Sequence, residues 1–328
     1  MKGRIIAGVC LKKGRHKYSD NRKAADPSRS RTAKEGLIVA HHGVAVEVLF
    51  SDGLRSTVGV KRRSGHVVGD RVQISDEVLD RLPRRTELRR RDARGGIHLV
   101  GANLDALGVV VAMLPVLPPG FIDRAIVAAR AADLQPFVVV NKCDLAGSDE
   151  LVRSLENAYA EAVPVFPLSA ADGDGLDPVL EFLKDKRGAF VGITGVGKSS
   201  LLNALCPGTD LKVGEIGHIT NRGRHTTTVS TLHSFHSGGE LIDTPGFQDF
   251  GLVDISAKDL AAYFPGFEKT SEGTCRFRDC RHRTEPGCAV IDLVAKGQVS
   301  TERYETYLEL LTEVESGEAE ARQKEWKK

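Results

Sequence analysis

The chain has 328 residues, of which 41% are hydrophobic and 27% are charged, which is enough for about two or three domains with ordinary buried cores. No run approaches the roughly 18 apolar residues of a transmembrane helix, and the apolar stretch at residues 5–11 lacks the cleavage pattern of a signal peptide. Composition therefore argues against a membrane protein, and we expect a cytoplasmic one that acts as a monomer.

Positive charge is concentrated at the N-terminus. Residues 1–34 hold 11 Lys and Arg against Asp20 and Asp26, a net charge of +9, and the remainder of the chain carries −7. This contrast predicts a basic flexible arm over residues 1–34. We favour RNA phosphates as its partner, with a solvated leader that has no partner as the alternative.

Residues 35–91 consist of short segments separated by turn signals. Val44, Val46, Val48 and Phe50 alternate along one segment up to the turn at residues 51–53. About five short strands without helices predict a small β-barrel of the OB type over residues 35–91. Such barrels often bind RNA on one face. The basic residues that suit this contact, and equally suit an ordinary solvated surface, are Arg55, Lys61, Arg62, Arg63 and Arg71.

Beyond a basic connector at residues 84–94, the pattern changes to buried apolar runs separated by helical segments. The predicted strands cover residues 109–114, 137–140 and 163–168, and the predicted helices cover residues 121–133 and 151–158. Strands alternating with helices are typical of a parallel sheet in an α/β domain.

Two of these strand ends carry a guanine-recognition pattern, Asn141-Lys142-Cys143-Asp144 and Ser169-Ala170. In N-K-x-D, the carboxylate can accept hydrogen bonds from guanine N1–H and the 2-amino group, which adenine cannot offer. Either motif alone could be a simple turn, but together with a phosphate loop they predict a guanine nucleotide. The predicted base-binding residues are Asn141, Lys142, Asp144, Leu145, Ser169 and Ala170.

The phosphate loop lies at residues 192–199, which match G-x-x-x-x-G-K-[ST]. A predicted strand at residues 189–191 precedes it, and a predicted helix follows whose N-terminus would face the phosphates. Lys198 would reach the outer phosphates and assist catalysis, and Ser199 would bind Mg²⁺. The predicted phosphate-binding residues are Gly192, Ile193, Thr194, Gly195, Val196, Gly197, Lys198, Ser199 and Ser200.

Two later segments predict the switches of a GTPase. In His225-Thr226-Thr227-Thr228, a threonine would close over the γ-phosphate; Thr226 and Thr227 are the catalytic candidates, with Thr227 a magnesium ligand. The strand end at residues 240–242 leads to Asp243-Thr244-Pro245-Gly246. There, Asp243 would hold Mg²⁺ through water, and the Gly246 N–H would contact the γ-phosphate.

The motifs occur in rotated order, because the guanine loops precede the phosphate loop and the switches. An ordinary GTPase begins with the phosphate loop. If the strands keep their usual places in the sheet, residues 92–253 form a circularly permuted GTPase domain. Its C-terminus then emerges directly after the second switch, so that whatever follows is moved by the element that responds to the γ-phosphate.

A metal site is predicted in the last part, residues 254–328. Cys275, Cys280, His282 and Cys288 offer three thiolates and one imidazole, enough for the closed tetrahedral shell of one structural zinc ion. The arginines between these ligands would give the region a basic surface for phosphate contacts: Arg276, Arg278, Arg281 and Arg283. A stripe at helical spacing predicts a packed helix, and the last dozen residues are expected to fray. That stripe contains Tyr304, Tyr307, Leu308, Leu311 and Val314.

From about residue 35 to 315, the sequence closely resembles the circularly permuted, small-subunit-dependent GTPases called RsgA or YjeQ. The resemblance rests on N-K-C-D at 141–144, G-I-T-G-V-G-K-S-S at 192–200, G-R-H-T-T-T at 223–228, D-T-P-G-F at 243–247 and the C-x₄-C-x-H-x₅-C cluster. It implies an OB barrel, a permuted GTPase and a zinc domain that dock on the small ribosomal subunit. It further implies binding to the subunit's rRNA during late maturation and GTP hydrolysis stimulated by the subunit. The basic arm before residue 35 is not covered.

The position after D-T-P-G predicts slow intrinsic hydrolysis. Many GTPases carry Gln there, whereas this chain has Phe247, whose apolar side chain cannot orient a water molecule. Two hypotheses can restore the rate: His225 orients the water, or a group on the ribosome does.

Two rival functions are open to the sequence. A permuted GTPase acting on the large ribosomal subunit would lack the preceding barrel and the following cysteine cluster. An RNA-binding protein with a non-catalytic nucleotide site would not need Lys198, Ser199, Asp144 and Asp243 together.

Overall fold

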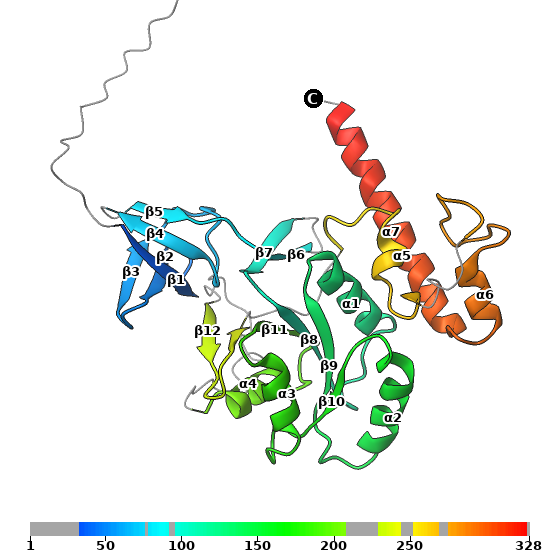
Figure 1. Ribbon diagram of the computed structural model, residues 1–328, viewed down its shortest axis with the longest axis horizontal. Helices are drawn as coiled ribbons and strands as arrows, with labels where there is room; N and C mark the ends of the chain where they lie inside the picture. The colour runs from blue at the N-terminus through cyan, green and yellow to red at the C-terminus, as the bar shows by residue number, and fades with distance from the viewer. Residues whose placement is uncertain are drawn as a thin grey trace, which may run out of the picture. The chain divides into compact units, whose positions relative to one another are not determined.

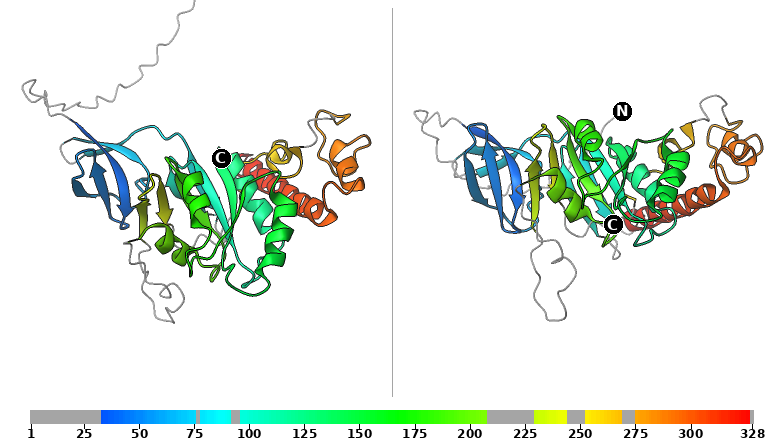
Figure 2. Two further views of the ribbon diagram at one scale, coloured as in Figure 1. Left: turned by 60° about the horizontal axis from the view of Figure 1, so that its bottom comes forward. Right: turned by 90° about the horizontal axis from the view of Figure 1, so that it is seen from below.

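The computed structural model describes residues 33–75, 78–91, 96–207, 229–243, 252–268 and 275–326, which Figures 1 and 2 show as ribbons. They belong to one unit of the chain, residues 33–328. A β-rich N-terminal region, an α/β core and a group of C-terminal helices follow one another along it.

The N-terminal region, which we call the barrel, consists of antiparallel strands around β1. β1 pairs with both β2 and β4, β2 with β3, and β4 with β5. Ile38, Val46, Val48 and Val72 are fully buried between them, so alternate residues face the interior, as a small barrel requires. The strands are β1 Lys34–His41, β2 Ala45–Phe50, β3 Arg55–Gly59, β4 Arg71–Ser75 and β5 Val78–Arg81.

The core is a sheet in the order β10-β9-β8-β11-β13-β12, parallel except for β12. Apolar side chains are buried on both of its faces, with α1 and α2 on one side and α3 and α4 on the other (Figure 1). The strands are β8 Ala106–Val111, β9 Gln135–Val140, β10 Val165–Pro167, β11 Arg187–Val191, β12 Ser230–Ser234 and β13 Glu240–Asp243. The helices are α1 Phe121–Ala131, α2 Ser148–Tyr159, α3 Leu176–Leu183 and α4 Lys198–Leu205.

The strand order confirms the predicted permutation. β11, which leads into the phosphate loop, lies in the middle of the sheet although β8, β9 and β10 precede it in the chain. From β8 the chain proceeds outward to β9 and β10, and from β11 it proceeds the other way to β12 and β13. The loops after β8 and β11 therefore flank the point where the winding direction reverses, which is where α/β sheets bind ligands.

Two local predictions were wrong. Part of the basic connector at residues 84–94 is strand, because β6 Glu87–Arg91 pairs antiparallel with β7 Ile97–Ala102. The strand predicted at residues 109–114 begins and ends three residues earlier. Although residues 112–114 are apolar, the chain leaves the sheet there: Leu114 is 63% exposed, and its carbonyl accepts a hydrogen bond from Lys142 Nζ.

Three helices form the C-terminal module, which we define as the described residues from 254 to 326. They are α5 Leu260–Tyr263, α6 Ala289–Ala295 and α7 Thr301–Trp326. The predicted packing stripe is correct: Tyr307, Leu311 and Val314 of α7 are buried against α5 and α6. The predicted fraying of the last dozen residues is wrong, since α7 continues to Trp326 through residues that favour helices, and Glu318 accepts a hydrogen bond from the Ala257 N–H.

The C-terminal module packs on α1 and α2 through a buried ion pair. Arg303 of α7 donates to Asp123 Oδ1 at 2.9 and 3.0 Å, and its guanidinium lies 4.6 Å from the Tyr159 ring centroid. Asp123 is 3% exposed, and its second oxygen accepts a hydrogen bond from Tyr159. A buried pair with its polar atoms satisfied holds two surfaces in one orientation.

The barrel is joined to the core by strand pairing. Ala40 and His41 at the end of β1 pair antiparallel with Thr231 and Ser230 of β12. The barrel sheet and the core sheet are therefore one hydrogen-bonded sheet, and the junction lies directly after the predicted first switch.

Candidate nucleotide site and metal centre

The phosphate loop connects β11 to α4 at the carboxyl edge of the sheet. A Cβ at Gly192 would lie 2.5 Å from the Val110 carbonyl oxygen, so only glycine lets the loop pass β8. Gly197 has φ of +96° and touches the Asn141 side chain, and α4 begins at the next residue. The loop thus directs backbone N–H groups and a helix N-terminus toward one point, as phosphate binding requires.

Lys198 folds back over this loop. Its Nζ donates to the carbonyls of Gly192 at 2.7 Å and Ile193 at 3.0 Å. Burial lowers the pKa of Lys198, and the Asp243 carboxylate partly offsets that effect. When nucleotide binds, this half-buried ammonium would exchange its carbonyl partners for phosphate oxygens. The negative charge of the phosphates would then favour the charged form of Lys198 and offset the effect of burial.

Asn141 ties the guanine loops to the phosphate loop. Its side-chain nitrogen donates to the Val196 carbonyl at 2.9 Å, and its oxygen accepts the Ala170 N–H at 3.0 Å. Asn141 is 2% exposed, so both bonds are shielded from water. One side chain therefore joins the three predicted nucleotide loops.

Lys142 and Asp144 of the guanine loop are each hydrogen-bonded to a neighbouring nucleotide loop. Lys142 Nζ donates to Gly195 O at 2.6 Å, while Asp144 accepts from Ser169 Oγ at 2.7 Å. Asp144 and Leu145 are exposed at the edge of the sheet. The Ser169 hydroxyl fixes the orientation of the carboxylate and leaves its other oxygen available to a ligand.

Asp243 is the last residue of β13 and interacts electrostatically with Lys198 of the phosphate loop. Burial raises its pKa, and the positive charges of His233 and Lys198 act in the opposite direction. In the β12–β13 ladder, Asp243 lies opposite Thr231, whose hydroxyl is 2.8 Å from His233 Nε2. The motifs did not indicate this Thr231–His233 pair. The sequence signal is limited to the spacing of two between Thr231 and His233, which places both side chains on one face of a strand.

The remaining site predictions lie outside the described residues. They are the first-switch residues His225, Thr226 and Thr227, together with Gly246 and Phe247 of the second switch. Among the described predictions, Thr194 is exposed, and Ser199 and Ser200 are half-buried in the first turn of α4.

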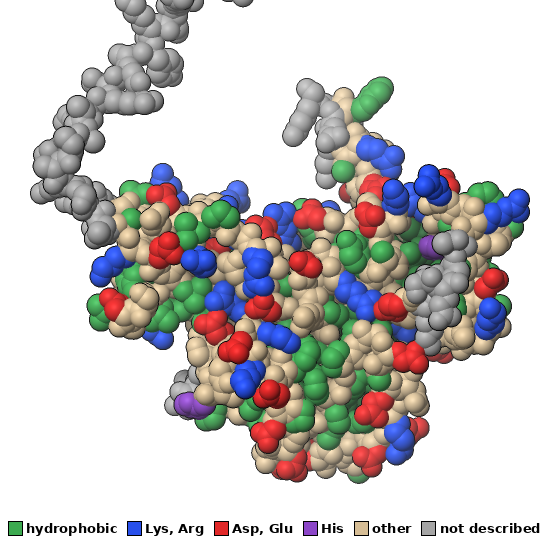
Figure 3. Space-filling view, in the orientation of Figure 1, with side chains coloured by type: hydrophobic (Ala, Val, Ile, Leu, Met, Phe, Trp, Pro, Cys, Tyr) green, Lys and Arg blue, Asp and Glu red, His purple; other side chains and the backbone are tan. Residues whose placement is uncertain are grey.

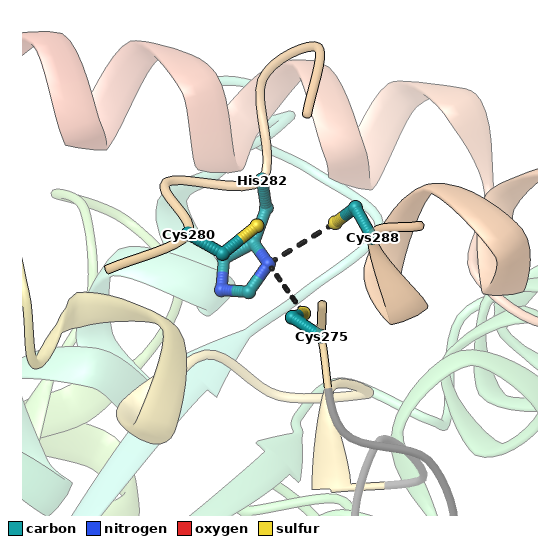
Figure 4. A group of neighbouring side chains, drawn as sticks. All are labelled: Cys275, Cys280, His282 and Cys288. Carbon is teal, nitrogen blue, oxygen red and sulfur yellow. Dashed lines mark hydrogen bonds between the residues drawn. The ribbon is translucent and has the colours of Figure 1, made fainter. Parts of the chain in front are cut away.

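The four predicted zinc ligands do come together (Figure 4). Their ligand atoms lie within 4.8 Å of one another, and His282 Nδ1 is 3.5 Å from Cys275 Sγ and 3.2 Å from Cys288 Sγ. A tetrahedral zinc ion with Zn–S bonds of about 2.3 Å needs sulfur atoms roughly 4 Å apart, so this donor set fits zinc. The cluster can therefore hold one zinc ion.

Hydrogen bonds to the backbone hold the loop that carries these ligands in place. Glu285 accepts the N–H groups of Arg281, Arg283 and Thr284 at 2.7–3.0 Å. Although burial raises it, these hydrogen bonds lower the pKa of Glu285 to about 2. From α7, Tyr304 donates to the His282 carbonyl at 2.6 Å. The motifs placed Tyr304 only in the packing stripe and did not indicate Glu285, although Glu285 begins the Glu-Pro-Gly sequence that precedes the last ligand.

The permuted sheet, the joined nucleotide loops and the appended Cys₃His module define a circularly permuted GTPase. The family model described as RsgA GTPase matches residues 81–253. The chain is 40% identical over 286 residues to the protein named "Small ribosomal subunit biogenesis GTPase RsgA" of Pseudomonas aeruginosa strain LESB58, covering 84% of each chain. It therefore belongs to the RsgA GTPase family and is a GTP-hydrolysing enzyme.

Solved structures agree with this assignment. YjeQ from Thermotoga maritima superposes with a TM-score of 0.69 at 33% identity, covering 86% of this chain and 98% of that one. YloQ, described as a circularly permuted GTPase, gives 0.64 at 28% identity over 89% and 98%. The predicted fold class is confirmed, while the predicted domain boundaries stay predictions. None of the described helices combines the length and apolar character needed to cross a membrane.

Proposed function

We propose that this enzyme hydrolyses GTP while bound to the small ribosomal subunit, assists late maturation of that subunit, and is stimulated by it. The observation that carries the proposal is the 40% identity over 84% of the chain to relatives named for small-subunit biogenesis. That span is longer than the GTPase domain and takes in parts of the flanking modules. None of the relatives compared above is named for the large subunit, so the alternative of a GTPase acting on the large subunit lacks this kind of support.

In this proposal, the nucleotide lies across the carboxyl ends of β8, β9 and β11. Asp144 reads guanine, the residues of the phosphate loop surround the phosphates, and Lys198 neutralises the outer ones. Mg²⁺ would be held by Ser199, Thr227 and, through water, Asp243, and would supply charge stabilisation at the γ-phosphate. Zinc on Cys275, Cys280, His282 and Cys288 would have a structural role, because all four positions of its shell are filled.

The flanking modules would supply the RNA contacts. Arg55 and Arg71 of the barrel pair with Glu47 and Glu35, but their side chains are 60% and 64% exposed, and such pairs are weak enough to exchange for phosphate. In Figure 3, Lys and Arg side chains are prominent on the barrel and lie among Asp and Glu on the C-terminal module, whereas Asp and Glu predominate at the lower edge of the core. This distribution favours RNA at the flanks of the GTPase domain.

The test is GTP turnover with isolated small subunits, isolated large subunits and neither. We expect small subunits to raise kcat by at least about fivefold, the lower end of usual coupling between sites. We expect large subunits to leave it unchanged. Stimulation by large subunits alone, or by neither, would overturn the proposal.

The water-positioning group is tested by His225→Ala. If His225 orients the attacking water, the variant should lose roughly 10²-fold or more of the stimulated turnover. Its GTP affinity should stay near that of the wild type, since no base or phosphate contact is assigned to the imidazole. Single-turnover hydrolysis on small subunits measures this. An unchanged stimulated rate would instead assign the role to a ribosomal group.

A further inference from the structure

The segment that leaves the second switch is held by the C-terminal module. The chain leaves β13 at Asp243, and the described structure resumes at Leu252. The Leu252 N–H donates to Glu313 Oε1 of α7 at 3.3 Å, and the Leu252 side chain, 6% exposed, packs in the same cluster as Val314. The first described residue after the switch is therefore attached to α7 by both backbone and side chain.

Glu313 also binds the core. Arg124 of α1 approaches both of its carboxylate oxygens, at 2.9 Å to Oε1 and 2.6 Å to Oε2. A bidentate guanidinium–carboxylate contact fixes the orientation of the carboxylate as well as its distance from the guanidinium. Glu313, a residue of the C-terminal module, thus accepts hydrogen bonds from two donors. One is Arg124 on a helix of the GTPase core, and the other is the Leu252 N–H in the segment that leaves the second switch.

Attachment of the module does not depend on this residue. Arg303 makes its own contacts with Asp123 and Ala158 of the core, and Arg130 of α1 donates to the Tyr263 carbonyl. Loss of Glu313 would therefore leave the module docked and remove only its bond to Leu252 and Arg124.

We infer that Glu313 is the positioning residue through which the nucleotide state at the second switch reaches the C-terminal module. The second switch of a GTPase changes with the γ-phosphate. The described chain resumes at the Leu252 N–H, and Glu313 converts a shift of this group into a change in α7, the helix whose Tyr304 donates to the zinc-ligand loop. The inference requires GTP binding but does not require the ribosomal partner.

The experiment compares Glu313→Ala with wild type and with Glu309→Ala, in zinc-loaded full-length protein. Alanine is used because the amide oxygen of glutamine could still accept the Leu252 N–H. Glu309 is exposed on the same helix and makes no hydrogen bond or ion pair with other described residues, so it is a matched control. Hydrogen exchange over residues 301–314 is measured with GDP and with a non-hydrolysable GTP analogue. We expect a nucleotide-dependent difference in exchange in wild type and Glu309→Ala, reduced about 2- to 30-fold in Glu313→Ala.

A charge swap separates the two contacts of Glu313. In Glu313→Arg combined with Arg124→Glu, the ion pair to α1 can re-form, but no carboxylate is left to accept the Leu252 N–H. We expect this double variant to behave like Glu313→Ala. The inference is overturned if Glu313→Ala keeps the nucleotide-dependent difference, if wild type shows none, or if the charge swap restores it. Because no ribosomal subunit is present, these results are distinct from failure of the proposed function.

Discussion

Replacing Lys198 with alanine should nearly abolish GTP hydrolysis. The ammonium lies over the phosphate loop, 2.7 Å from the Gly192 carbonyl oxygen, and is partly withdrawn from water. Removing a preorganised charge donor in such a site typically lowers kcat by about 10²–10³-fold. Since the same group neutralises ground-state phosphates, GTP affinity should also fall. Single-turnover hydrolysis and titration with a fluorescent GTP analogue measure the two effects separately.

Lys184→Ala is the matched control for this prediction. Lys184 is an exposed lysine after α3, and its 4.0 Å ion pair with Glu181 contributes little to stability. The Lys184→Ala substitution should therefore leave nucleotide binding and turnover unchanged. Turnover in Lys198→Ala within about a factor of ten of wild type would contradict the assigned role, because a loss that small falls below the effect of one such donor.

The nucleotide half of the site was predictable because its chemistry is local. A phosphate loop needs glycines where the backbone passes another strand, and Gly192 and Gly197 meet that need at fixed spacing. Asn141 and Asp144 follow directly from the end of β9, so a strand prediction places them at the sheet edge. The order of these motifs was sufficient to predict the permutation that the sheet confirms.

Long-range contacts were not predictable in the same way. The β6–β7 ladder depends on cross-strand pairing such as that of Arg90 with His98, and the run of arginines indicated charge rather than a strand. The part of α7 that continues to Trp326 includes Glu318. The Glu318 side chain accepts a hydrogen bond from the N–H of Ala257, which lies 61 residues earlier in the chain. A single sequence carries no signal for such partners.

The permutation decides which module adjoins the exit of which predicted switch. The barrel precedes the core in the chain, and the C-terminal module follows Leu252, the first described residue after the second switch. The barrel meets β12 through the pairing of His41 with Ser230, directly after the predicted first switch. The C-terminal module meets Leu252, directly after the second. Each flanking module is thus bonded to the exit of one predicted switch.

Replacing Cys288 with serine should release the zinc ion and destabilise the C-terminal module. Cys288 is 2% exposed, precedes α6, and packs in the same cluster as Leu260 and Tyr307. A serine hydroxyl is a poor zinc ligand beside thiolates, and metal binding to such sites contributes directly to folding. Zinc affinity should fall by more than the roughly 10- to 100-fold that loss of an outer-shell partner costs.

Zinc content by elemental analysis, chelator competition and limited proteolysis of the full chain measure this effect. Cys143→Ser is the control, since it makes the same substitution at a half-buried cysteine that lies outside the cluster, and it should retain one zinc ion per chain. Because Arg303 anchors α7 to Asp123 independently of the metal, proteolysis in Cys288→Ser should begin in the ligand loop, residues 275–288, and reach α7 later. Full zinc occupancy in Cys288→Ser would show that Cys288 is not a ligand, and simultaneous cleavage of the loop and α7 would show that the metal, and not the Arg303 contact, holds the helix in place.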